Sequence, residues 1–497
     1  MLRRILISLL ATALAAAAFV AWSLDSPNSP QPHLEGTFRI AGVQLIEPGI
    51  RRSVNTTLEV RDGVLSSVRA TRSGESSDLE ESPGMYVLPG LMDLHTHLPP
   101  DSPLALTEIF GLLYIAHGVT TVRDAGDLDG SAYPAALRVY AEELNVGPRP
   151  LTCGPFVGGP GSRWANSVAV ERPEQAQEVV QGLIDAGYHC IKIYDGLDRE
   201  RIRALVDAAR SVGLPALGHV PFGMTFEEAR LPNTQHLMGV ALPETIAAGD
   251  HVIHRIMDWS SVDAARMRDV VRISSELGLV HTPTLASGYA LRHYRDLEAA
   301  RSEASIALLP RFYRDVVWDP ELGVRTYRGL SEDDLDLFDE TLRKKLQMIR
   351  LLHEAGVELR IGTDTQQPFV VPGASVWTEM RLWERAGIPI EDIWAYATWK
   401  GAAETGIERL GRIEEGAPAD FLVFADDPTR SLDALDSLVA ISAGGRLHLY
   451  SDLSSSIEEY RAFYERWLVD ELSIRVAKAK LASTSSSDEH ANGVESR

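Results

Sequence analysis

Residues 87–97 read VLPGLMDLHTH, an apolar run that ends in two histidines separated by one residue. In a β-strand, residues i and i+2 point to the same side, so His95 and His97 would present both imidazoles on one face. Two imidazoles on one face are half of a typical metal site. The position of the pair, directly after an apolar segment, predicts that it lies at the end of a buried strand.

The chain that follows alternates short apolar runs with longer helical stretches, from about residue 91 to residue 403. This alternation predicts parallel strands joined by helices. About eight strands over residues 90–404 predict an α/β fold of the (β/α)8 TIM-barrel type. Besides the first run, the expected strands include GVTTVRD (118–124), RPLTCG (149–154), CIKIYDG (190–196), ALGHV (216–220), TQHLMG (234–239), VHTPTL (280–285) and ELRIGTD (358–364).

Polar residues stand at the ends of several of these strands. His219, His236 and Asp364 lie at or next to such ends, and Lys192 lies within an apolar run. The carboxyl ends of barrel strands meet at one mouth, where such folds keep their active sites, so we expect these residues to converge with the HTH pair. A lysine made neutral by burial can react with carbon dioxide to give a carbamate, an anion that can bridge two metal ions.

Each of these residues also has an ordinary structural alternative. A strand histidine often serves only as a buried hydrogen-bonding group, an aspartate in GTD as a turn residue or helix cap, and a lysine as half of an ion pair. Other histidines in this region are assigned to that structural class. His281 is the strongest exception among them, because it stands at the start of a predicted strand.

Both flanks of the barrel are predicted to contain strands. Residues 36–89 read as short strands and turns, and residues 405–450 return to strand-like alternation. We expect the two to form one small β-sandwich domain built from both ends of the chain. Residues 451–482 are predicted to form a helix, and the polar residues 483–497 a disordered tail.

The connection between VHTPTL and ELRIGTD is long for this kind of fold. It is rich in Arg, Asp, Tyr and Leu, and its pattern predicts several helices. At this position in the chain they would lie over the barrel mouth, where lids and specificity elements occur.

The N-terminus has the features of a targeting segment. Two arginines precede an apolar run from Ile5 to Trp22. Its length lies between that of a signal-peptide core and that of a membrane span, so we expect residues 1–22 to be a cleaved signal peptide or an uncleaved membrane anchor. Either alternative exports the rest of the chain, to the periplasm or the extracellular space, beyond a polar linker at residues 23–35. The remaining alternative is a helix buried in the main domain.

Charge and cysteine content narrow the function classes. The chain has 48 Lys and Arg against 70 Asp and Glu, a net charge of −22, which argues against nucleic-acid binding because phosphate contact needs basic patches. Cys153 and Cys190 are too few for a disulfide scaffold or a cysteine-rich zinc site. Two separate buried thiols are the favoured interpretation, and one disulfide is the alternative in an oxidising compartment.

Several motifs in order resemble those of the amidohydrolase superfamily, in the branch that contains imidazolonepropionase and metal-dependent prolidase-like dipeptidases. The resemblance spans residues 38–449 and is carried by VRDGVLSSV, VLPGLMDLHTH, GVTTVRDAG, DAGYHCIKIYDG, GTD and GRIEEGAPADFLVF. It implies a site for two divalent metal ions, expected to be zinc given nitrogen and oxygen ligands. The implied ligands are His95, His97 and Asp364 for the first ion, Lys192 as a bridging carbamate, and His219 and His236 for the second. Asp364 is also the implied catalytic acid and base.

Two segments depart from the pattern of the family. GHVPFG, at the fifth strand, lacks a second histidine that relatives often place after the ligand, and GPFVGGPGSRW lacks the histidine expected after its two glycines. These segments normally shape the substrate pocket, so the substrate stays open. The candidate pocket residues, chosen by position, are Trp164, Tyr194, His281 and Tyr289.

The sequence thus predicts an exported metal-dependent amidohydrolase that cleaves a C–N amide bond in a dipeptide, an N-acyl amino acid or a related small amide. A mononuclear deaminase or cyclic-amide hydrolase on the same barrel is one alternative, although a single metal needs no bridging Lys192. A catalytically inactive binding barrel at the membrane surface is the other. Relatives are often oligomeric, so the resemblance also raises a homo-oligomer as an expectation.

Overall fold

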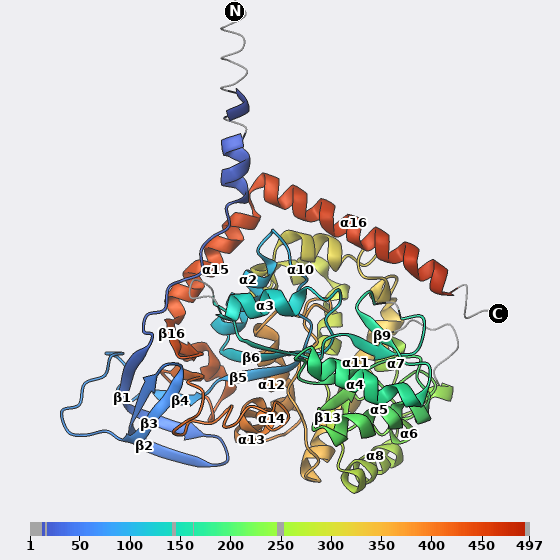
Figure 1. Ribbon diagram of the computed structural model, residues 1–497, viewed down its shortest axis with the longest axis horizontal. Coiled ribbons are helices and arrows are strands. Elements are labelled where there is room, and N and C mark those ends of the chain that lie inside the picture. Colours follow the sequence, from blue (N-terminus) through green and yellow to red (C-terminus); the bar gives the residue numbers. More distant parts are fainter. Residues whose placement is uncertain (1–11, 15–16, 142–145, 163, 246–252, 493–497) are drawn as a thin grey trace, which may run out of the picture.

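The computed structural model describes residues 12–14, 17–141, 146–162, 164–245 and 253–492, with side chains described as far as residue 482. Parallel strands surrounded by helices make up the main body, and a mixed sheet lies at one end of it (Figure 1). The last two helices run along one side of both parts.

Short parallel strands form the centre of the main body. They lie in two sheets, one with the order β5-β6-β7 and one with the order β13-β12-β11-β10-β8-β9. This arrangement confirms the predicted α/β class. Their bounds are β5 (Leu91–Thr96), β6 (Val119–Asp124), β7 (Arg149–Thr152), β8 (Phe156–Gly158), β9 (Ser167–Ala169), β10 (Ile191–Ile193), β11 (Ala216–Gly218), β12 (Asn233–Gln235) and β13 (Val280–Thr282).

Backbone contacts join the two parallel sheets on both sides. On one side, residues 359–365 make a parallel bridge to Thr96 of β5 and another to His281 of β13. On the other, the chain runs from β7 directly into β8, and the amide of His189, just before β10, donates to the carbonyl of Thr152 in β7 (2.8 Å).

A buried ionic cluster also connects strands of both sheets. Glu404 accepts hydrogen bonds from Arg123 of β6 (3.2 Å) and from Asn233 of β12 (3.0 Å), and its other oxygen lies 3.1 Å from Arg360. Strands that are distant in sheet order therefore meet at one side chain.

Helices cover the outer side of the strands (Figure 1). Several begin at a capping carboxylate, since Asp198 accepts from the amide of Arg201 and Asp263 from that of Arg266, which satisfies amides that the helix itself leaves unpaired. The helices are α2 (Leu106–Ala116), α3 (Ala132–Ala141), α4 (Ala176–Asp185), α5 (Arg199–Ser211), α6 (Phe226–Ala229), α7 (His254–Met257), α8 (Ala264–Leu277), α12 (Ala374–Arg385), α13 (Ile390–Ala397) and α14 (Trp399–Ala402).

The long connection after β13 is helical, as predicted. It contains α9 (Leu285–Ala290), α10 (Leu297–Ser302) and several shorter turns before the long helix α11 (Glu332–Glu354). Tyr327 donates a hydrogen bond to Gln367 (2.5 Å), and Phe369 packs against His293 with ring centroids 5.3 Å apart. The connection therefore covers the segment that directly follows Asp364.

Both ends of the chain contribute to one mixed sheet with the order β16-β15-β14-β4-β1-β2-β3. The sandwich prediction is corrected here, because the strands form a single sheet. The sheet is curled, so that β3 at its edge approaches the segment before β14. There the amide of Leu65 donates to the carbonyl of Ala417 (2.9 Å). The strands are β1 (Thr37–Glu47), β2 (Arg51–Arg61), β3 (Val64–Ala70), β4 (Tyr86–Pro89), β14 (Phe421–Phe424), β15 (Leu438–Ala443) and β16 (Arg446–Leu449).

The chain closes with two helices, α15 (Tyr450–Tyr464) and α16 (Trp467–Asn492). α16 includes most of the segment predicted to be a disordered tail, and residues 493–497 lie outside the described residues. The predicted targeting segment at residues 1–22 is described only in part, and residues 17–24 of the chain form a helix that projects from the body (Figure 1). Within the described ranges, no helix is both long enough and apolar enough to cross a membrane.

Cys153 and Cys190 form a disulfide, so the preference for two separate thiols is wrong. The bond connects the residue after β7 to the residue before β10 and is fully buried beside Ala125 and Leu217. The two cysteines are 37 residues apart in the chain, and the backbone contact between β7 and the segment before β10 brings them together.

Replacing both cysteines with alanine should lower the free energy of unfolding by about 2–4 kcal/mol, because the cross-link restricts the unfolded chain. Denaturant titrations with and without a reducing agent measure this change. The reducing agent should destabilise the wild-type protein and leave the double variant unaffected. Equal stability of the two proteins would contradict a stabilising disulfide.

Candidate metal centre

The polar residues singled out in the sequence lie at the carboxyl ends of the parallel strands, where a parallel arrangement brings them to one edge. Their positions are His95 within β5, His97 just after it, Lys192 at the centre of β10, His219 directly after β11, His236 directly after β12, and Asp364 within residues 359–365, which bridge to β5 and β13.

Three of these side chains form a compact group. Oδ1 of Asp364 lies 3.4 Å from Nε2 of His95 and 3.4 Å from Nε2 of His97, and one ligand atom of each residue lies within 4.8 Å of the others. His95 is fully buried, and neither of its ring nitrogens has a hydrogen-bond partner among the described residues. Buried polar atoms without a hydrogen-bond partner are rare, and a metal cation would give a ring nitrogen of His95 a partner. The group therefore fits a metal ion.

The hydrogen bonds of His97 determine which of its nitrogens can bind a metal. Nδ1 lies 2.9 Å from the carbonyl oxygen of Gly126. A carbonyl oxygen can only accept, so Nδ1 must carry a proton, and in the neutral ring Nε2 then carries the lone pair. That lone pair is on the side of Asp364. A backbone carbonyl that orients a ligand histidine is a common feature of metal sites.

The same reasoning applies to His236. Its Nδ1 lies 2.6 Å from Oγ1 of Thr284, whose own proton is donated to the carbonyl of Pro283 (2.9 Å). Nδ1 of His236 is therefore the donor, and its Nε2 carries a lone pair that lies 3.0 Å from Nε2 of His219. Burial lowers the pKa of His236 to about 3, so the ring is neutral. Two neutral imidazoles with facing nitrogens fit a second metal ion.

The two histidine groups adjoin each other. The ring centroids of His95 and His236 are 4.6 Å apart. Lys192 belongs to the same cluster. Burial is the main reason that the pKa values of His95 and His219 are lowered, and the positive charge of Lys192 is the next.

Lys192 is fully buried within β10, and its Nζ donates to Oε1 of Gln235. Burial lowers the pKa of Lys192 to about 7, so the neutral amine is accessible near neutral pH. A neutral amine is the form that reacts with carbon dioxide, and the residue thus has the chemistry that a carbamate requires.

Asp364 is held as a carboxylate in a constrained backbone. Burial alone would raise the pKa of Asp364, but His236, His95 and His97 together hold it well below its usual value. Its φ of 62° lies in the left-handed region that most residues avoid. Gly362, two residues earlier, allows this segment to pass close to β5, because a Cβ there would lie 2.6 Å from Cβ of His95.

Sequence reasoning missed two aspartates that support these ligands. Asp93 accepts hydrogen bonds from the amides of His95 (3.3 Å) and Thr363 (3.0 Å), and so connects β5 to the strand that carries Asp364. Asp124, at the end of β6, lies 3.8 Å from Nδ1 of His97. Both belong to quoted motifs, MDLHTH and VTTVRD, and their place at strand ends was the available signal.

An aromatic wall borders the cluster. Tyr194 packs against His219 with centroids 4.7 Å apart, and Phe156 stacks on Trp164 at 5.3 Å. Phe156 also contacts Tyr194 (5.0 Å) and lies 6.1 Å from His97. Trp164 and Tyr194, two predicted pocket residues, are therefore near the candidate metal centre, and Phe156 joins them although the sequence analysis did not select it.

Of the other two predicted pocket residues, His281 is directed away from the cluster, and Tyr289 stays a prediction. Nε2 of His281 lies 2.9 Å from Oγ of Ser274 in α8, so its ring is directed toward the outer helices. A strand exposes alternate residues to opposite sides, which explains why a strand-start histidine can miss the mouth. Tyr289 in α9 lies under Arg292 (3.6 Å) and near Arg385 at the end of α12 (5.6 Å).

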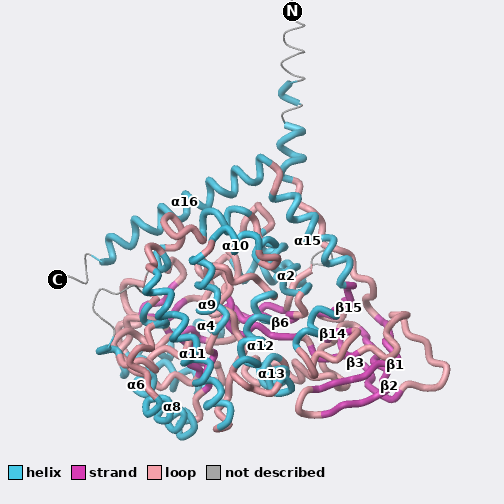
Figure 2. The backbone as a smooth tube through the Cα atoms, turned by 180° about the vertical axis from the view of Figure 1, so that it is seen from behind, coloured by secondary structure: helices cyan, strands magenta, loops and turns pink. Residues whose placement is uncertain are grey.

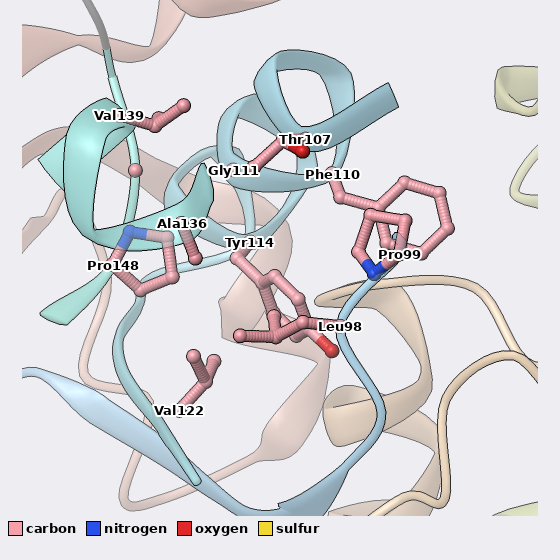
Figure 3. A pocket seen from close by; sticks show the side chains of 11 residues that line it. Leu98, Pro99, Thr107, Phe110, Gly111, Tyr114, Val122, Ala136, Val139 and Pro148 are labelled. Carbon is pink, nitrogen blue, oxygen red and sulfur yellow. The ribbon is translucent and has the colours of Figure 1, made fainter. Parts of the chain in front are cut away.

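A small apolar cavity lies between α2, β6 and α3 (Figure 3). Tyr114 lines it and shares a hydrogen bond with Oγ1 of Thr96 (2.6 Å), between the two ligand histidines. The lining contains no charged side chain, and the hydroxyl of Tyr114 is engaged with Thr96. It is formed by Leu98, Pro99, Thr107, Phe110, Gly111, Tyr114, Val122, Ala136, Val139, Gly147 and Pro148.

This chain is similar to several known proteins. An adenine deaminase of Lysinibacillus sphaericus (strain C3-41) is 28% identical over 94 residues, which cover 19% of this chain and 16% of that enzyme, so this chain matches about a sixth of its length. The solved structure of a bottromycin amidohydrolase is similar with a TM-score of 0.68 and 24% identity, over 89% of this chain and 92% of that one. A Xaa-Pro dipeptidase solved with bound methionine has a TM-score of 0.59 and 19% identity, over 83% of this chain and all (100%) of that one.

These structural likenesses concern the fold. The sequence model described as the amidohydrolase family matches residues 86–449, from β4 to the end of β16, and so includes every candidate ligand and most of the chain. This chain belongs to the amidohydrolase family.

Proposed function

We propose that this chain is a hydrolase that uses two divalent metal ions, expected to be zinc, to cleave a C–N amide bond in a small substrate. A dipeptide or an N-acyl amino acid is the expected substrate class, in line with the prolidase-like branch of the family. The observation that carries the proposal is the buried, unpartnered imidazole of His95 beside His97 and Asp364.

The chain offers two adjoining ligand groups. His95, His97 and Asp364 would hold one ion, and His219 and His236 the other, with Lys192 as a carbamate between them. When bound, such ions lower the pKa of water toward about 7 and polarise a carbonyl oxygen.

The side chains of the chain itself account for the remaining steps. Asp364, a carboxylate at neutral pH, accepts the proton of the attacking water as the C–O bond forms. It then delivers that proton to the nitrogen as the C–N bond breaks. Phe156, Trp164 and Tyr194 bind the apolar part of the substrate and exclude bulk water from one side of the site.

We also infer that the strands close into an eight-stranded barrel and that the protein works outside the cytoplasm. The bridges made by residues 359–365 and the β7–β10 contact support closure. The buried Cys153–Cys190 disulfide supports an oxidising compartment, and so does the targeting pattern of residues 1–22.

A deaminase with a single metal ion is the second candidate, favoured by the local match to an adenine deaminase. In such an enzyme Lys192 would keep its hydrogen bond to Gln235. The number of metal ions per chain separates the two candidates.

Elemental analysis of the full chain, purified without chelators, should give about two divalent metal ions per chain, as in two-metal hydrolases. The same sample should hydrolyse members of a library of dipeptides and N-acyl amino acids. His95→Asn should lose metal, whereas His448→Asn, which alters a buried histidine in β16 of the mixed sheet, should retain it. About one metal ion per chain would favour the deaminase. A chain that holds no metal ion even after metal and bicarbonate are added would favour the catalytically inactive binding barrel.

A further inference from the structure

One side of the molecule carries an unusual concentration of exposed apolar side chains. They lie on residues 12–14 and 17–24 of the N-terminal segment and on α16, and are Leu14 (62% exposed), Phe19 (48%), Val20 (43%), Trp22 (58%), Leu24 (40%), Trp467 (68%), Leu472 (36%) and Val476 (47%). Exposed apolar clusters of this kind mark surfaces that contact a partner or a membrane.

The two helices are fixed to each other where they meet. The guanidinium of Arg466 donates to the carbonyls of Trp22 (2.7 Å) and Asp25 (2.8 Å), and it stacks over the Trp22 ring at 4.9 Å. Farther along, Tyr460 of α15 donates to the carbonyl of Pro27 (3.1 Å). The point where the N-terminal helix leaves the body is therefore the point where α16 begins.

α16 runs away from this corner along the side from which the N-terminal helix projects, in both views (Figures 1 and 2). Its inner face is packed, since Val469, Ser473 and Ala477 are buried. Asp470 at its start pairs with Arg311 of the connection below (2.9 Å). The helix is thus seated on the protein by one face and leaves the other uncovered.

The uncovered face is also basic in an acidic protein. Arg475, Lys478 and Lys480 are exposed on α16 and outnumber Glu471, whose carboxylate lies 3.4 Å from the guanidinium of Arg475, while the whole chain has a net charge of −22. Tryptophan is enriched at the membrane–water interface, and nearby Lys and Arg are attracted to anionic headgroups. Trp22 and Trp467 together with these cations have that composition, at the end of the apolar run Ile5–Trp22.

We propose that the outer face of α16, from Trp467 to Lys480, lies on the surface of the lipid bilayer that the N-terminal apolar segment enters. The segment supplies attachment, Trp22 and Trp467 sit at the headgroup level, and the basic residues of α16 contact anionic lipid. The rest of the molecule, including the mixed sheet and α8, faces away from the membrane. This proposal does not depend on the metal centre or on catalysis.

The test uses the full chain in vesicles of phosphatidylcholine and phosphatidylglycerol. Val476→Cys is labelled with an environment-sensitive fluorophore, and the matched control is Leu277→Cys at the end of α8, on the opposite side of the molecule (Figure 1). The native cysteines are joined in a buried disulfide, so the label reacts with the introduced thiol. The label at 476 should shift to the blue and be quenched by lipids that carry a nitroxide, while the label at 277 should stay as in water.

A second variant tests the charge contribution. Arg475→Glu, Lys478→Glu and Lys480→Glu combined should reduce the blue shift at 476 in vesicles that contain the anionic lipid. A label at 476 that stays in water, or a protein that does not float with the vesicles, overturns the proposal. So does a label that is shielded without vesicles in a concentration-dependent manner, because the face would then bind a second copy of the chain.

Discussion

Asp364→Asn should lower kcat by about 10²–10⁴-fold, the range of a general acid–base catalyst. Asparagine keeps the size of the side chain and one oxygen for a metal ion, but it cannot accept the proton of the attacking water. The histidines around Asp364 hold the pKa of its carboxyl well below the usual value, so the wild-type group is an ionised carboxylate at neutral pH. Steady-state kinetics on a library hit, with metal content and thermal unfolding measured on the same sample, give the result.

Asp427→Asn is the matched control for this variant. The two side chains are similarly buried, with that of Asp427 6% exposed and that of Asp364 9% exposed. Asp427, however, accepts hydrogen bonds from Thr429 and Arg52 beside the mixed sheet. It should retain wild-type kcat. An Asp364→Asn variant that keeps both full activity and full metal content would overturn the assigned role.

Lys192→Met should reduce the metal content from about two ions to about one or fewer, and most of the activity should be lost with it. Methionine has nearly the volume of lysine and suits the apolar surroundings of β10, so the fold should persist. Carbon-13 NMR after incubation with labelled bicarbonate should show a carbamate signal in the wild-type protein that Lys192→Met lacks.

Lys345→Met is a stringent control for this experiment. Lys345 in α11 is also buried, and burial lowers the pKa of Lys345 to about 7 as well. Its Nζ donates to the carbonyl of His236 (3.1 Å), away from the metal-facing nitrogens. If burial alone were enough to form a carbamate, Lys345→Met would also reduce the carbamate signal. If the metal cluster is required, only Lys192→Met removes it. A signal that survives in Lys192→Met would exclude the bridging carbamate.

The sequence located the candidate ligands because strand ends are local features. The spacing of His95 and His97 has the period of a strand, and the runs around Lys192, His219 and Asp364 are short and apolar with a polar end. Parallel strands then bring these ends to one edge, whatever the details of packing.

Contacts between residues distant in the chain were harder to foresee. The disulfide depends on the contact between β7 and the segment before β10, where the amide of His189 meets the carbonyl of Thr152. The ring of His281 in β13 contacts Ser274 of α8, whereas Tyr194, just after β10, packs on His219. Phe156 and Asp93 lie within quoted segments, but their roles come from the neighbours that the fold gives them, Trp164 for Phe156 and Thr363 for Asp93.

By itself, therefore, the sequence determined the alternation of strands and helices, the ligand types and their order along the chain. Hydrophobic periodicity and residue chemistry are properties of short segments, so they can be read without a fold. Only the tertiary structure decided which nitrogen of His97 and His236 carries the lone pair. Those protons depend on the carbonyl of Gly126 and the hydroxyl of Thr284, and only the folded chain brings these groups within hydrogen-bonding distance.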